Sequence, residues 1–165
     1  MRVQVLTSSA TMQRYQAQVW ALLVASYEKV AGGLHYETVA QLINTSAEWK
    51  VVLHNRQVVA VTIYRAKKGL KLVAMASCNK LRQLGRLGLM RVLSQDLKRC
   101  WMELSEGAER FVMRYCGGDR YLINNSLACQ ILEKDEVIAA ENSYHYYREV
   151  NNVRKQKILL GTVRT

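Results

Sequence analysis

The sequence contains no proline, although a chain of 165 residues with average usage would hold roughly eight. Proline-rich linkers, PxxP ligands and turns built on a cis-proline are therefore excluded. Cysteine is sparse as well: there are four, with no CxxC pair and no cluster with the three histidines, which argues against a zinc site. We expect no metal, and we expect the cysteines to be small buried apolar side chains.

The chain also lacks a long apolar run. The longest apolar window, residues 19–24, is far shorter than the roughly 20 residues that span a bilayer, and the first residues hold no apolar core of a signal peptide. We therefore expect a soluble, cytoplasmic protein with no membrane partner. Half of the residues are hydrophobic (50%) and 22% are charged, which is typical of a globular chain, and the length suits a single domain over residues 1–165.

Acidic residues are nearly missing from one third of the sequence. Residues 50–100 carry twelve Lys or Arg residues and one acid, Asp96, and so hold the whole net charge of +11. Such local basicity predicts a face that binds phosphates or a polyanion, nucleic acid included. A solvated charged rim around strands is the alternative reading of the same pattern.

Hydrophobic spacing predicts an α/β chain with the order β-α-α-β-β-β-α-β-α-β-β. The expected strands are residues 2–6, 49–53, 58–64, 70–76, 110–115, 144–150 and 155–160. The expected helices are residues 11–30, residues 36–44, a long helix that follows a Gly- and Arg-rich loop at 78–88 and runs to about residue 104, and residues 121–134. Turns are expected at 54–57, 67–69 and 151–152, where Asn and Gly tolerate positive φ.

The loop at 78–88 holds candidate phosphate ligands. Gly85 and Gly88 would let phosphate oxygens approach the backbone, and Arg82 and Arg86 offer bidentate guanidinium donors. The N-terminus of the following helix adds positive potential. Phosphate binding is therefore predicted here, with an ordinary glycine-containing turn as the alternative.

The element order and two motifs resemble those of the GNAT (GCN5-related) N-acyltransferases, and the chain looks like a divergent member. The segment Arg82-x-x-Gly85-x-x-Gly88 resembles the family's pyrophosphate loop Gln/Arg-x-x-Gly-x-Gly/Ala, with the second glycine one residue late. The stretch Asn125-x-x-Ala128-x-x-Ile131-Leu132-Glu133-Lys134 resembles the later family motif Asn-x-x-Ala-x-x-Leu-Tyr-Glu-Lys.

This resemblance implies a GNAT-like single domain with a mixed, mostly antiparallel central sheet flanked by helices. It also implies an acyl-CoA-dependent N-acyltransferase, in which an amine attacks the thioester of acetyl-CoA, or of another acyl-CoA, directly. The implied cofactor-binding residues are Ala76, Ser77, Arg82, Gly85, Arg86, Gly88 and Asn125, with a backbone donor for the oxyanion on the strand before the loop. The implied substrate-binding residues are His35, Tyr36 and Tyr64.

The proton donor needs a separate candidate, because Leu132 stands where the family has its acidic tyrosine. Tyr144, His145 and Tyr146 are the predicted catalytic residues. Alternation along a strand puts the two tyrosines on one face and His145, which can take up a proton near neutral pH, on the other. An aromatic cross-strand stripe is the structural alternative.

Three functions stay open on the sequence alone. The first is the acyltransferase that the resemblance implies. The second is a GNAT-fold protein that binds nucleic acid or modifies a DNA base through residues 50–100, by analogy with phage DNA-modification proteins of the Mom type. The third is a catalytically silent GNAT-fold binding module. The acceptor amine, the acyl group and the oligomeric state are not fixed by any motif.

Overall fold

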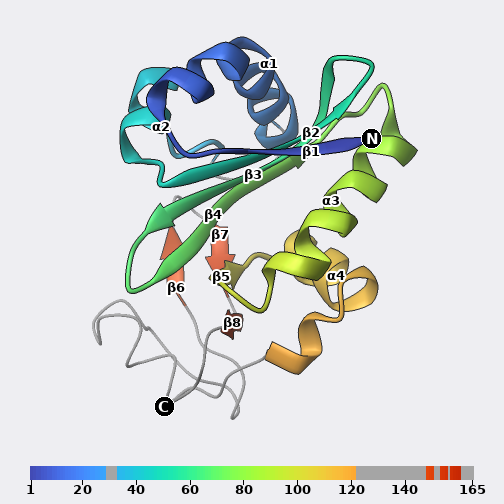
Figure 1. Ribbon diagram of the computed structural model, residues 1–165. Helices are drawn as coiled ribbons and strands as arrows, with labels where there is room; N and C mark the ends of the chain where they lie inside the picture. Colours follow the sequence, from blue (N-terminus) through green and yellow to red (C-terminus); the bar gives the residue numbers. More distant parts are fainter. Residues whose placement is uncertain (29–32, 122–147, 151–152, 156, 161–165) are drawn as a thin grey trace. The chain divides into compact units, whose positions relative to one another are not determined.

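The computed structural model describes residues 1–28, 33–121, 148–150, 153–155 and 157–160 (Figure 1). Its contacts divide the chain into two units, Met1–Val92 and Leu93–Thr165. Each unit has its own strands and helices.

Four antiparallel strands form the sheet of the first unit: β1 (Arg2–Leu6), β2 (Glu48–His54), β3 (Gln57–Ala66) and β4 (Leu70–Ser77). Valine and isoleucine are frequent in β2 and β3, as suits half-buried pleated surfaces. Two tight turns join β2 to β3 and β3 to β4. They place Asn55, Arg56, Lys68 and Gly69 at positive φ. Strands β2, β3 and β4 therefore form a meander.

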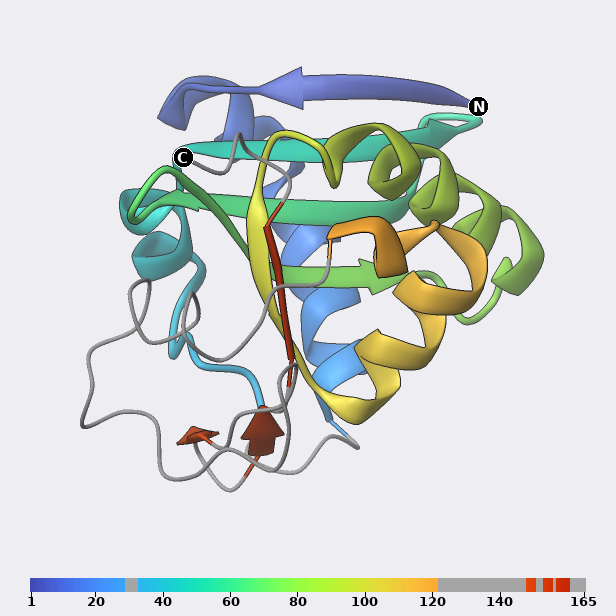
Figure 2. The same cartoon turned by 90° about the horizontal axis from the view of Figure 1, so that it is seen from below.

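Helices α1 (Ser9–Tyr27) and α2 (Val39–Thr45) cover one face of this sheet, and the first turns of α3 (Arg82–Asp96) lie on the other (Figure 1, Figure 2). Ser8 caps α1, because its side chain accepts the N–H of Thr11 while the Thr11 hydroxyl accepts the N–H of Ser8. The core beneath α1 and α2 consists of buried apolar side chains that include Val19, Leu23, Leu42, Trp49, Val51 and Ile63. Alternation then directs the Val52 side chain to the opposite face, toward α3.

In the second unit, β5 (Trp101–Leu104) pairs antiparallel with β8 (Lys157–Leu160). Helix α4 (Glu106–Tyr115) follows β5, and one turn of 3-10 helix, η1 (Gly118–Tyr121), follows α4. Acidic residues in the first turn of α4 and Arg114 in its last turn suit the helix dipole. Strands β6 (Arg148–Val150) and β7 (Val153–Lys155) pair with each other.

The structure confirms an α/β chain, and the expected succession of strands and helices holds as far as α3. In the first unit the predicted strands agree with β1 to β4 to within about two residues at each end. A hairpin does flank residues 151–152, since Val150 pairs with Val153, but its second strand is β7. The strand expected at 155–160 was assigned to the wrong partner, because its residues 157–160 form β8 and pair with β5. Among the helices of the described ranges, none combines the length and the apolarity needed to cross a bilayer.

Two predicted elements of the second unit were wrong. The long helix does not run to Leu104: α3 ends at Asp96, and the last predicted residues form β5. The strand expected at 110–115 lies inside α4. Both errors arise from short apolar runs, because a run such as Phe111 to Met113 fits a buried strand as well as one face of a helix. The helix expected at 121–134 falls, beyond Tyr121, outside the described residues.

Candidate functional site

The candidate site is built around the carboxyl end of β4. Strand pairing extends one residue past β4, since the N–H of Cys78 donates to the carbonyl of Val59 at 2.8 Å. The N–H groups of an antiparallel strand alternate between its two sides. The N–H groups of Met75 and Ser77 therefore point away from β3.

The same alternation bears on Ala76, which we expected to bind the cofactor. Its N–H points to β3, and its side chain is buried in the core beneath α1. This geometry argues against a direct contact between Ala76 and a cofactor. Ser77 is half-buried and offers its N–H on the other side of the strand, so of the two residues only Ser77 keeps the predicted role.

A short turn after Cys78 leads directly into α3. The first bond of the helix runs from the N–H of Gly85 to the carbonyl of Leu81 at 2.8 Å. The N–H groups of Arg82, Gln83 and Leu84 thus precede the first intrahelical bond, as in the first turn of any helix. They form an N-terminus whose dipole favours an anion.

Positive side chains surround this N-terminus. Lys80 and Arg82 are exposed, and Arg86 is half-buried one turn further along. No acidic residue occurs between Glu48 and Asp96 in the sequence. The positive side chains and the helix dipole therefore both raise the positive electrostatic potential at this N-terminus, which favours binding of phosphate groups.

Gly85 and Gly88 lie within α3, on the side that packs against the sheet, and not in the loop where we expected them. A Cβ at Gly85 would stand 2.9 Å from both the backbone nitrogen of Cys78 and the carbonyl oxygen of Val59. A Cβ at Gly88 would stand 2.8 Å from Cγ1 of Val52. Both glycines are explained by the close approach of helix to sheet, and a contact of either with a cofactor stays a prediction.

Two tyrosines, Tyr27 and Tyr36, interact with each other, and Tyr27 contacts the backbone of β4. The hydroxyl of Tyr27, the last residue of α1, accepts the N–H of Met75 at 3.3 Å. Burial raises the pKa of the Tyr27 phenol, the Met75 N–H opposes that rise, and Tyr36 adds to it. The pKa of Tyr36 is also raised by burial, with a hydrogen bond to Thr45 and the charge of Arg65 acting against the rise. Both phenols are therefore protonated at neutral pH.

Sequence reasoning missed Tyr27. Trp20, Leu23 and Tyr27 fall at helical spacing in the sequence, which favours an apolar face, and nothing in that spacing reveals that the Tyr27 hydroxyl reaches the backbone of β4. The Tyr27 hydroxyl lies beside the Met75 N–H, two residues before Ser77, and both N–H groups point away from β3. Two residues of strand correspond to about 7 Å, which is the expected spacing of the Met75 and Ser77 N–H groups along β4.

The other predicted residues are distributed more widely. His35 is exposed in the segment before α2, and Tyr36 is half-buried three residues before it. Tyr64 is fully buried in β3 (0% exposed), so it supports the sheet in this structure. The predicted residues Asn125, Tyr144, His145 and Tyr146, like Leu132, lie outside the described residues.

Comparisons of sequence find no match: no family model fits the chain, and no curated protein sequence does. Comparison of structures finds several. ElaA from Escherichia coli superposes with a TM-score of 0.58 at 12% identity, covering 96% of this chain and 99% of that protein. A GNAT-family protein from Bacteroides thetaiotaomicron gives 0.55 at 16% identity, with 99% and 89% covered.

A third solved structure, an acyl-CoA N-acyltransferase from Pseudomonas aeruginosa, gives a TM-score of 0.53 at 11% identity, with 96% of this chain and 99% of that protein covered. Identities this low establish the fold and not the activity. The element order, the helix that docks at the end of β4 and the near-complete coverage agree with the resemblance found in the sequence. The chain therefore has the fold of the GNAT superfamily.

Proposed function

We propose that the protein is an acyl-CoA-dependent N-acyltransferase. The observation that carries this proposal is the start of α3, held against the end of β4 by Gly85 and flanked by Lys80 and Arg82, in a chain with the GNAT fold. A helix N-terminus, which favours anions, thus follows a strand whose Met75 and Ser77 N–H groups point away from β3.

The residues present fit the phosphates of coenzyme A. The N–H groups of Arg82, Gln83 and Leu84 and the exposed guanidinium of Arg82 supply donors for a diphosphate, and the guanidinium can bind it in a bidentate manner. When bound, an acyl-CoA supplies an acyl group already activated as a thioester. We propose that this acyl group is acetyl or another short acyl group.

The chain's own groups would position the reactants, stabilise the negative charge that develops on the carbonyl oxygen, and hold or move protons. The N–H of Ser77 is the candidate donor for the oxygen that becomes negative when a neutral amine attacks. Tyr27 accepts a hydrogen bond from Met75 and keeps its own proton, because burial raises the pKa of its phenol. We assign Tyr27 the role of holding a proton next to this strand. His145 remains the candidate for taking a proton from the amine, and Tyr144 and Tyr146 remain candidates for protonating the departing thiolate of CoA.

An acyl-transfer assay tests the proposal. Purified protein is mixed with acetyl-CoA and, in turn, with peptide N-termini, lysine peptides, polyamines and amino sugars. Release of free thiol is followed together with the mass of the amine. We expect thiol release that depends on one class of amine and falls by roughly tenfold or more in Arg82→Ala, since a charge-assisted contact to phosphate is lost.

The assay separates the proposal from its alternatives. If a folded protein binds acetyl-CoA and transfers nothing to any amine, the catalytically silent module replaces the enzyme. If it neither binds nor transfers, the assignment of α3 is wrong. Arg14→Ala, which removes an exposed arginine of α1, is the matched control and should change neither result.

Nucleic-acid binding is a second candidate because residues 50–100 carry more positive charge than one coenzyme needs. Exposed basic residues of this segment lie near both ends of the sheet and on α3. They are Arg65, Lys67 and Lys68 at or near the β3–β4 turn, Arg56, Lys80 and Arg82 toward the opposite end, and Arg91 and Lys98 on and just after α3. A polyanion bound there would show a steep loss of affinity with rising salt. No binding of DNA or RNA at low salt would exclude this candidate.

A further inference from the structure

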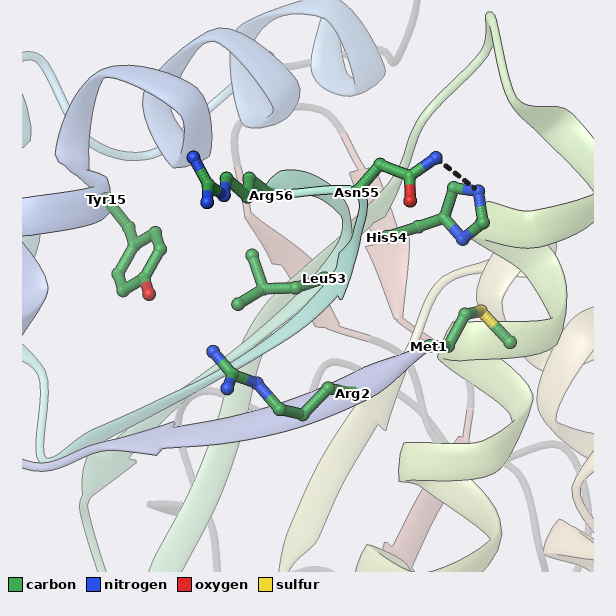
Figure 3. Close-up of a pocket in the computed structure, with 7 residues that line it drawn as sticks. All are labelled: Met1, Arg2, Tyr15, Leu53, His54, Asn55 and Arg56. Carbon is green, nitrogen blue, oxygen red and sulfur yellow. Dashed lines mark hydrogen bonds between the residues drawn. The ribbon is translucent and has the colours of Figure 1, made fainter.

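A hollow of about 720 Å³ opens at the end of the first unit's sheet, beside the turn between β2 and β3 (Figure 3). Arg2 of β1, Tyr15 of α1, Leu53 of β2 and Arg56 of the turn lie on its walls. None of its lining residues belongs to α3 or to the end of β4. It is therefore a different place from the candidate acyltransferase site.

The hollow is positively charged. Two arginines line it and no acidic residue does. Figure 3 shows Arg2 and Arg56 on either side of Leu53, with their guanidinium ends turned toward the side on which Tyr15 lies. Two guanidinium groups from different elements around one opening are suited to a phosphate, since each can bind phosphate oxygens in a bidentate manner.

Hydrogen bonds hold one wall in place. The Oε1 of Gln4 accepts the hydroxyl of Tyr15 at 2.9 Å and, more weakly, a guanidinium N–H of Arg2 at 3.4 Å. This bond orients Arg2 along the wall. It engages only one of the guanidinium N–H groups. Arg56 makes no hydrogen bond or ion pair with any residue that the structure describes.

The backbone at Arg56 gives an independent indication. Asn55 and Arg56 have φ of 49° and 65°, which is the two-residue turn that favours Asn followed by Gly. A glycine at position 56 would relieve the strain of the left-handed conformation. Position 56 holds an arginine although its backbone conformation favours glycine. Because the Arg56 side chain lines a basic hollow, we infer that this side chain has a function there.

We propose that this hollow binds the phosphate of a nucleotide, with Arg2 and Arg56 as its ligands. The volume lies in the range of small-molecule sites and exceeds what one inorganic anion fills. The partly exposed ring of Tyr15 provides apolar surface for a base or sugar, and His54 and Asn55 add polar groups at the rim. The nucleotide is either free or part of a single-stranded nucleic acid. This proposal does not depend on the acyltransferase function.

The test is a titration followed by NMR or calorimetry at low salt, made in the Arg82→Ala background so that the candidate phosphate site at α3 is weakened. Uridine monophosphate, inorganic phosphate and a short oligouridylate serve as probes. We expect uridine monophosphate to bind more tightly than inorganic phosphate. We expect Arg2→Gln and Arg56→Gly each to weaken binding by roughly tenfold or more, through loss of a charge-assisted pair.

Controls separate a ligand from a charge effect. Arg14→Gln removes the same charge from the residue next to Tyr15 but outside the hollow, and should leave affinity unchanged. Arg56→Gly should also unfold at a higher temperature than the wild type, so lost binding cannot be ascribed to unfolding. If the oligouridylate binds more tightly than uridine monophosphate, with the same dependence on Arg2 and Arg56, the ligand is a nucleic acid. If the two bind equally, the ligand is a free nucleotide. No binding of any probe, or equal losses in Arg14→Gln, overturns the proposal.

Discussion

The close approach of α3 to the sheet can be tested by adding one methyl group at Gly85. The Cβ of Gly85→Ala would stand 2.9 Å from the Cys78 nitrogen and 2.9 Å from the Val59 carbonyl oxygen. Those two atoms are joined by the hydrogen bond that closes the end of the β3–β4 pairing. Backbone atoms in a paired strand cannot rotate away as a side chain can. The methyl group must therefore displace the first turns of α3.

The magnitude follows from two opposing effects. Replacing glycine by alanine inside a helix stabilises it by up to about 1 kcal/mol. Overpacking against a well-packed neighbour costs about 1–3 kcal/mol. Gly85→Ala should therefore be neutral to destabilising by about 2 kcal/mol. Gly107→Ala in α4, where a Cβ meets nothing within 4 Å, should show only the stabilising effect.

Chemical denaturation of the two variants measures the difference. Gly85→Ala should be less stable than Gly107→Ala by about 1–3 kcal/mol, because the propensity gain is common to both. Gly88→Ala should fall between them, since the Val52 side chain that it meets can adjust. Gly85→Ala should also weaken acetyl-CoA binding. If Gly85→Ala stabilises the protein as much as Gly107→Ala does, the docking of α3 described above is wrong.

Three further changes have defined outcomes. Thr62→Val should stabilise the protein by about 1 kcal/mol in denaturant, since the buried Thr62 Oγ1 has no hydrogen-bond partner among the described residues; a loss of stability would mean that the hydroxyl is in use. Tyr27→Phe should destabilise the protein by about 1–3 kcal/mol, because it leaves the Met75 N–H without its acceptor, and an unchanged unfolding midpoint would refute that bond. Burial raises the pKa of Cys116 from 9.0 to about 11, so the folded state keeps the thiol protonated while the unfolded state ionises first. Stability should then fall between pH 9 and pH 11 by up to about 2 kcal/mol, and Cys116→Ala should lose this part of the pH dependence.

The first unit was largely predictable from the sequence because its signals are local. Alternating β-branched runs marked β2 and β3, and the residues at positions 55 and 69 marked the turns between strands. The error in the length of α3 arises from the same kind of local signal. Leu97, Trp101 and Leu104 fall at helical spacing, so only tertiary pairing with β8 reveals that Trp101–Leu104 is a strand.

The candidate site was predicted in part. The basic start of α3 was found from charge and glycine spacing, which are visible in the sequence. The packing role of Gly85 and Gly88 could not be found from the sequence, because it depends on which atoms of the sheet lie beneath the helix. Tyr27 reaches Met75 across 48 residues of sequence, and Gln4 joins Arg2 to Tyr15 through two bonds to one oxygen. Contacts of that kind carry no signal in a single sequence.

The proposed function requires that the start of α3 binds the phosphates of an acyl-CoA. Calorimetric titration of the folded protein with acetyl-CoA, repeated with Arg82→Ala and with Arg14→Ala, measures this binding. We expect a dissociation constant on the order of micromolar, weakened by roughly tenfold or more in Arg82→Ala and unchanged in Arg14→Ala. Absence of binding in the wild type, or binding that is indifferent to Arg82, would contradict it.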